Sequence, residues 1–142
     1  MSFWDTSAIV PLFINEDRSQ LARRLWRQFS QRNVWRESSV EVASTIARLA
    51  REGVLNEPLR TKTEERFSWI EKEWTIIDPT EKLIGLARMF PSLYGLKSLD
   101  SLQLASALIW CKENPKNKDF VCGDGKLLKA AEAAGFTIHD LT

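Results

Sequence analysis

The sequence predicts an α/β fold with a mainly parallel central sheet. Short runs rich in β-branched and aromatic residues recur along the chain, and segments with apolar residues at helical spacing separate them. This alternation is typical of parallel sheets, because each helix carries the chain back across the sheet to the next strand. No internal repeat or linker rich in Gly, Ser or Pro interrupts the pattern, so we expect a single domain spanning residues 1–142.

Five short segments fit strands. The runs NVWR, WTIID and DFVCG combine β-branched and aromatic residues, and the pair Asp78-Pro79 ends the second run. A last run, FTIHDL, follows Gly135, which is expected to close the preceding helix. The expected strands are residues 2–5, 33–36, 74–78, 119–123 and 136–141.

The segments between the strands carry helix start and stop signals. Gly53 stands where the residue after a helix belongs, Pro58 suits a first turn, and Thr80 and Ser98 suit N-caps. The segment PSLYGLK is expected to be a loop. The expected helical segments are residues 6–13, 19–30, 38–52, 58–72, 80–90, 98–112 and 126–134.

Composition narrows the function classes. The chain has 44% hydrophobic and 27% charged residues, which is typical of a soluble globular protein, and no apolar run approaches the roughly 18 residues of a membrane span. The N-terminus lacks the basic segment of a signal peptide. Cys111 and Cys122 lack metal-ligand spacing, which predicts a reducing, cytoplasmic location. The single histidine, His139, argues against a histidine zinc site or a Ser-His-Asp triad.

Arginine is unevenly distributed. The net charge of +1 argues against a protein that coats nucleic acid by bulk electrostatics. The stretch from residue 18 to residue 36, however, holds arginines and no acidic residue. It fits either a phosphate-facing surface or a solvated helix face, and charge alone favours the second. These arginines are Arg18, Arg23, Arg24, Arg27, Arg32 and Arg36.

Four acidic residues are the candidate functional residues. Asp5 ends the first expected strand and Asp124 follows the fourth, while Glu41 and Asp100 each lie in the first turn of an expected helix. Ligands of open α/β sheets bind beyond the carboxyl ends of the strands. The topology can therefore gather these acids at one edge, although they are far apart in the sequence.

Each acid also has a purely structural interpretation. Asp5 can cap the segment TSAIVPLF, Ser38-x-x-Glu41 fits a capping box, and Asp100 suits the dipole at the start of its helix. Asp124, in GDGK, suits a turn or a cap. The apolar surroundings of Asp5 and Asp100 favour function instead. Gathered carboxylates repel one another, and Mg²⁺ or Mn²⁺, which prefer oxygen ligands, relieve that repulsion.

Four blocks of the sequence, in collinear order, resemble the signature motifs of PIN-domain proteins. They are FWDTSAIV, SSVEVASTIARL, LKSLDSLQLASAL and FVCGDGKLLKAAEAAGF. The resemblance is strongest to the VapC-type ribonuclease toxins of prokaryotic toxin–antitoxin pairs. It implies a three-layer α/β/α sandwich and Mg²⁺- or Mn²⁺-dependent cleavage of RNA by metal-activated water. It also implies a small cognate antitoxin protein that covers the acidic cleft, and a homodimer; the lack of a long apolar run separately predicts no association with membranes.

The resemblance implies which residues form the acidic site, and we add hypotheses about the roles of these and neighbouring residues. We take Asp5 and Asp124 as direct metal ligands, Asp100 next, and Glu41 as acting through water or as a base. Further contacts to RNA are expected from Lys97, Lys126 and Lys129, and Trp26, Trp69 and Trp110 are candidates for lining a groove that accepts the antitoxin. The assigned residues are Asp5, Glu41, Asp100 and Asp124 as acidic metal ligands and catalytic groups, with the hydroxyls of Thr6 and Ser7 assisting near the metal.

Two departures from the family pattern keep a non-enzymatic alternative open. Gln103 stands where many members have His, and Cys122 stands where Ser or Thr commonly precedes the last acid. A catalytically degenerate PIN-like module that binds protein or RNA fits these departures. A phosphatase or phosphoacceptor domain also places an Asp after its first strand. WDTSA lacks the second Asp of a haloacid-type phosphatase, however, and no paired acids precede Asp5 as in a receiver domain.

Overall fold

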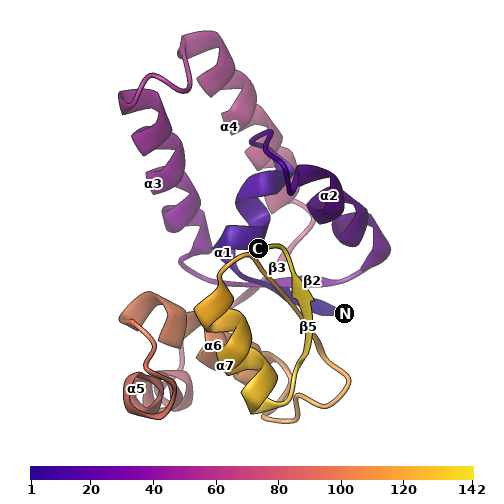
Figure 1. The fold of residues 1–142 in the computed structure, drawn as a ribbon, viewed down its shortest axis with the longest axis vertical. Coiled ribbons are helices and arrows are strands. Elements are labelled where there is room, and N and C mark those ends of the chain that lie inside the picture. Colours follow the sequence, from indigo (N-terminus) through magenta and orange to yellow (C-terminus); the bar gives the residue numbers. More distant parts are fainter.

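A five-stranded parallel sheet forms the centre of the protein, and helices cover both of its faces (Figure 1). The structure, a computed structural model, describes residues 1–142. The strand order is β3-β2-β1-β4-β5, which places β1 in the middle, and each neighbouring pair is parallel. The expected fold class, an α/β/α sandwich around a parallel sheet, is confirmed. The strands are β1 (Ser2–Trp4), β2 (Arg32–Trp35), β3 (Thr75–Ile77), β4 (Asp119–Cys122) and β5 (Thr137–Asp140).

The helices lie close to their predicted positions. The first expected segment is divided into α1 (Thr6–Ile9) and the 3₁₀ helix η1 (Val10–Leu12), because Pro11 has no N–H to continue the α-helical ladder. The remaining helices are α2 (Ser19–Gln28), α3 (Ser38–Arg51), α4 (Glu57–Glu71), α5 (Glu81–Tyr94), α6 (Ser98–Trp110) and α7 (Gly125–Ala134).

The expected loop over residues 91–97 is wrong at its start. Helix α5 continues to Tyr94 with Pro91 inside it, and ends at Gly95, whose φ of 66° lies in the left-handed region. The rings of Phe90 and Tyr94 pack with centroids 5.5 Å apart in this last turn. Packing of the turn against α6 and the core outweighs the one hydrogen bond that Pro91 cannot donate.

Alternating side chains along the strands build two apolar layers, one on each face of the sheet. In β1, Phe3 packs with residues of α5, α6 and α7, whereas its neighbour Trp4 packs with residues of α1, α2 and α3. Both side chains are fully buried. The strands β2 and β4 alternate in the same way. Because both faces of β1 are buried, its carboxyl end is held rigidly at the centre of one sheet edge.

Helices α3 and α4 lie side by side as a pair that extends away from the sheet (Figure 1). The pair is anchored at its base by Val42 and Ile46 of α3, which belong to the layer around Trp4. None of the helices combines the length and the apolar character that crossing a bilayer requires.

Substitution of Phe120 in β4 tests the packing of the apolar layer beneath α5–α7. Its ring stacks on Phe3 at 5.4 Å and also contacts Phe136, and it is completely buried. We expect Phe120→Ala to lower the free energy of unfolding by about 3–5 kcal/mol, because it removes these contacts and leaves a cavity. Met89→Ala, at an exposed position of α5, is the control and is expected to change it by less than about 0.5 kcal/mol. Urea titration followed by circular dichroism measures both, and equal effects would contradict the packing described.

Candidate functional site

A cleft of about 540 Å³ lies at the carboxyl edge of the sheet, and all four candidate acids line it. They come from four different places in the fold. Asp5 follows β1, Asp124 follows β4 with one residue between, and Glu41 and Asp100 lie in the first turns of α3 and α6. Thr6 and Ser7 line the same cleft. The parallel sheet thus brings together residues separated by more than a hundred positions.

Asp5 is both a helix cap and a buried carboxylate. Its side chain accepts hydrogen bonds from the backbone N–H of Ser7, at 3.1 Å, and from the Ser7 hydroxyl. It is only 5% exposed, and no cationic side chain forms an ion pair with it. The expected cap is therefore confirmed, and the negative charge of Asp5 remains uncompensated.

Asp124 also caps a helix. Its Oδ1 accepts from the backbone N–H groups of Lys126 and Leu127, at 3.0 and 3.1 Å, at the start of α7. The two residues before Asp124 connect it to the Asp5 segment. The Cys122 thiol lies 3.7 Å from Asp5 Oδ2, and the Gly123 N–H donates to Ser7 Oγ at 2.8 Å. Both caps use one carboxylate oxygen, so each residue keeps a second oxygen without a hydrogen-bond donor.

The capping box expected from Ser38-x-x-Glu41 is wrong. Glu37 is the N-cap of α3 and makes no side-chain capping bond. The buried Ser38 hydroxyl instead accepts from Gln103 Nε2 of α6 at 3.2 Å, and the same Nε2 lies 3.4 Å from Glu41 Oε1. The Glu41 carboxylate is therefore turned to the cleft and to α6, not to the start of its own helix.

The expected Ser98 cap is wrong as well. Lys97 is the N-cap of α6 and contributes no side-chain bond, and Ser98 is the first helical residue. With Lys97 as the N-cap, Asp100 is the third residue of the helix, whereas a cap at Ser98 would have made it the second. Its side chain is partly buried and lines the cleft together with Glu41 and Asp124.

Burial and mutual repulsion make these carboxylates hard to ionise. Burial, together with the charges of Asp5 and Asp100, raises the pKa of Glu41 to about 7, against the lowering effect of hydrogen bonds from Thr6 and Gln103. Burial likewise raises the pKa of Asp100 to about 6, together with the charges of Asp124 and Asp5, against the opposing effect of Lys97 and Lys126. Burial also raises the pKa of Asp5 above its ordinary value. A cation bound in the cleft would oppose these shifts, because positive charge nearby favours the ionised form of a carboxyl group.

The donor set fits a hard divalent cation. The cleft is lined by the carboxylates of Asp5, Glu41, Asp100 and Asp124 and by the hydroxyls of Thr6 and Ser7, and such oxygens suit Mg²⁺ or Mn²⁺. As the side chains stand, no three Asp, Glu, His or Cys residues of the chain converge closely enough to coordinate one ion together. The acids surround the cleft and do not meet at one point. A cation would therefore bind some of them directly and reach the others only after side-chain movement or through water.

Most of the arginines between residues 18 and 36 are used locally. Arg23 and Arg32 bond backbone carbonyls of Leu12 and Trp26, and Arg36 pairs with Asp78. Only Arg18 of this set lines the cleft. Arg18, Arg23, Arg32 and Arg36 make contacts in different parts of the structure, and a local phosphate-facing surface in this stretch stays a prediction.

The expected tryptophan groove does not form from the three residues together. Trp26 is 4% exposed and packs edge-on against Trp4, and Trp110 is partly buried beside Phe3. Trp69, 68% exposed on α4 beneath Lys72, is the one that faces solvent. Large aromatic rings near a sheet gain more from burial than from exposure, which explains the outcome for the other two.

Two further residues of the site have roles that the sequence did not reveal. Gln103, 1% exposed, donates through Nε2 to Thr6 at 3.1 Å as well as to Ser38, so it joins α1, α3 and α6 beneath the acids. Arg18 contacts the segment before Asp124. Gln103 is visible in the sequence only as a departure from the family pattern, and Arg18 only as one of several arginines.

Comparisons with known proteins support the fold. No family model matches the chain, and no curated protein sequence matches it. A chain of a toxin–antitoxin complex from Klebsiella pneumoniae is 17% identical and superposes with a TM-score of 0.67 over 96% of this chain and 97% of that one. A chain of the FitAcB crystal structure from Neisseria gonorrhoeae is 16% identical, with a TM-score of 0.67 over 96% and 97%. The chain therefore shares its complete fold with both.

The raised pKa of Glu41 predicts a pH-dependent stability. In the folded, metal-free protein this carboxyl holds its proton up to about pH 7, whereas its ordinary pKa is 4.5. The folded state therefore binds more protons between these values, and stability falls as the pH rises through this window. Glu41→Gln removes the charge, so we expect the variant to gain stability over the wild type as the pH rises from 4.5 to 7. Urea unfolding in EDTA measures the difference, and a constant difference would contradict the burial of Glu41.

Proposed function

We propose that this protein is a metal-dependent endoribonuclease and the toxin of a toxin–antitoxin pair. The observation that carries the proposal is the cleft itself, where four acids from four elements gather without an ion pair to any cationic side chain. Uncompensated carboxylates at the carboxyl edge of a parallel sheet are poised to bind a cation. The fold shared with a chain of the toxin–antitoxin complex from Klebsiella pneumoniae supports the same function.

The four acids would hold Mg²⁺ or Mn²⁺. Asp5 and Asp124 are proposed as direct ligands because each keeps one carboxylate oxygen free of its capping bonds. Asp100 is the next ligand, and Glu41 acts through water or as a base. When bound, the ion supplies positive charge opposite the scissile phosphate and lowers the pKa of water to near neutrality.

The chain's own residues prepare the site in three ways. Ser7 donates its hydroxyl proton to Asp5 and accepts from the N–H of Gly123, which sets the separation of the ends of β1 and β4. Gln103 orients Glu41 from beneath through its Nε2. Glu41, with its pKa of about 7, is able to take up a proton near neutral pH.

The proposed partners are an RNA substrate, a small antitoxin protein and a second copy of the chain. The two structures with the same fold are described as a toxin–antitoxin complex and as FitAcB. An exposed apolar rim beside the acids, with Val54 57% and Leu99 53% exposed, suits an antitoxin that covers the cleft. A toxin that cleaves cellular RNA has to meet this RNA in the cytoplasm, so we propose a cytoplasmic location for the protein.

The alternative is a binding module without catalysis. Cys122 favours it, because this buried thiol replaces a hydroxyl next to Asp5 and its pKa is raised by burial and by the charge of Asp5. A neutral thiol is a poor ligand for Mg²⁺. The module would bind RNA or protein at the same cleft and cleave neither.

Asp5→Asn tests the enzymatic proposal. Purified wild type is expected to cleave RNA with Mg²⁺ or Mn²⁺ and to stop when EDTA is added. Asn keeps an oxygen that accepts from the Ser7 N–H, so the cap is retained while the negative charge is lost. We expect the cleavage rate to fall at least about a hundredfold, or roughly 2.7 kcal/mol. Gel analysis of labelled RNA fragments measures it.

The matched control is Asp17→Asn, which removes the same charge at an exposed position. It is expected to keep wild-type activity. Full activity in Asp5→Asn would refute the proposed site.

Calorimetry with Mn²⁺ distinguishes the nuclease from the binding module. Binding to the wild type that weakens in Asp100→Asn supports the nuclease, and no binding at all favours the binding module.

Expression with and without a neighbouring gene tests the toxin role. We expect the chain alone to arrest growth and to degrade RNA, and a small protein encoded directly upstream to prevent both when co-expressed. The Asp5→Asn variant is expected to allow growth without that partner. Growth curves and gels of total RNA measure the outcome, and arrest by Asp5→Asn equal to that by the wild type would contradict toxicity through RNA cleavage.

A further inference from the structure

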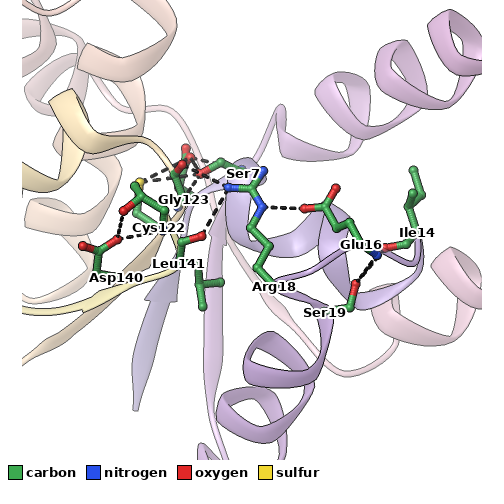
Figure 2. Close-up of polar contacts among 11 residues, drawn as sticks. Ser7, Ile14, Glu16, Arg18, Ser19, Cys122, Gly123, Asp140 and Leu141 are labelled. Atoms are coloured by element: carbon green, nitrogen blue, oxygen red, sulfur yellow. Dashed lines mark hydrogen bonds and ion pairs between the residues drawn. The ribbon is translucent and has the colours of Figure 1, made fainter.

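Arg18 is the arginine of the N-terminal stretch that reaches the acidic cleft. It lies at the N-cap of α2, and its side chain crosses to the ends of β4 and β5 (Figure 2). Nη1 donates to the carbonyl oxygens of Gly123, at 3.1 Å, and Leu141, at 3.4 Å. Nε donates to Glu16 Oε1 at 2.5 Å. The guanidinium is therefore held at three points, although the side chain is 35% exposed.

Gly123 provides the space that Arg18 occupies. A Cβ at this position would lie 2.3 Å from Arg18 Nη1 and 3.1 Å from the carbonyl oxygen of Ser7. Only glycine permits so close an approach, and Gly123 directly precedes the proposed ligand Asp124. The guanidinium is thus fixed against the backbone segment that carries one of the acids.

One edge of the guanidinium remains free. Nη2 makes no hydrogen bond within the chain, and Arg18 forms no ion pair with Asp5, Glu41, Asp100 or Asp124. Arg48, the other arginine that lines the cleft, pairs with Glu52 of its own helix. The cleft therefore holds a rigid positive group whose free N–H groups are not consumed by the acids.

We propose that Arg18 binds a phosphate oxygen of the RNA strand in the cleft, next to the phosphate that is cleaved. This inference rests on the proposed function and names the residue that positions its substrate. A cleft lined by carboxylates repels a phosphodiester, so a strand needs a local cation to lie there. Guanidinium N–H groups form strong charge-assisted bonds to phosphate oxygens. Because Arg18 is already held by Gly123, Leu141 and Glu16, it loses little conformational freedom on binding.

Binding of a labelled single-stranded RNA in EDTA tests the proposal without cleavage. We expect Arg18→Gln to weaken binding about tenfold and to make the slope of log K against log salt less negative by about 0.7, the value for one phosphate contact on a single strand. Arg27→Gln, at an exposed position of α2, removes the same charge and is expected to stay within about twofold of the wild type. Fluorescence anisotropy over a range of salt concentrations measures both.

A second pair of variants covers the case in which Arg18→Gln fails to fold. Glu16→Gln releases the Nε contact and removes a negative charge beside Arg18, so it is expected to tighten RNA binding about threefold. Asp17→Asn removes a charge one residue away and is expected to change binding less. The proposal would be overturned if Arg18→Gln and Arg27→Gln, or Glu16→Gln and Asp17→Asn, had equal effects on RNA binding when folded. It would also be overturned if Arg18→Gln weakened RNA binding without changing the salt slope.

Cleavage by the same variants separates this inference from the proposed function. If the wild type cleaves RNA and Arg18→Gln matches Arg27→Gln in KM, the role of Arg18 alone is refuted. If Arg18→Gln weakens binding of the antitoxin but not of RNA, the guanidinium binds the protein partner and the proposal also fails. A wild type that neither binds nor cleaves RNA refutes both.

Discussion

Ser7 joins the carboxyl ends of the two central strands, and the cleft depends on this contact. Its hydroxyl donates to the Asp5 carboxylate after β1 and accepts from the Gly123 N–H after β4. The backbone N–H of Asp5 extends the same pairing by donating to Val121 at 3.0 Å. Two buried layers, one on each face of the sheet, hold β1 and β4 from above and below, so the acids that follow them have little freedom to separate.

This rigidity explains why the carboxylates stay together although they repel. Separating Asp5 from Asp124 would require breaking the strand pair and moving Trp4 and Val121 out of one apolar layer. Uncovering those apolar side chains costs free energy, and this cost opposes the repulsion between the two carboxylates. The fold thus maintains an unfavourable charge arrangement at its edge, and the pKa values of Glu41 and Asp100 are raised first by burial and then by the neighbouring carboxylates.

The cations around the acids divide into two kinds. Lys97 and Lys126 are exposed, and their charges lower the pKa of Asp100 through space. Arg18 is bound to backbone carbonyls and pairs with Glu16, but it forms no ion pair with the four candidate acids. Carboxylates left free for a metal ion, beside a guanidinium left free for a phosphate, are what hydrolysis of a phosphodiester at this cleft would need.

The order of strands and helices was predictable from the sequence, because hydrophobic periodicity and helix caps are local properties. The caps at Asp5 and Asp124 and the α/β class belong to this group. The capping box at Ser38 and Glu41 was not predictable, since Gln103, distant in sequence, takes both side chains as partners. The helical turn through Pro91 was not predictable either, because packing against other helices stabilises it. The sequence by itself determined which acids are present and which ends of strands they follow. Only the tertiary structure decided that these acids share one cleft with Arg18. The physical reason is that the guanidinium packs against Gly123 where segments distant in the sequence meet, and the absence of a Cβ on Gly123 leaves the space for it.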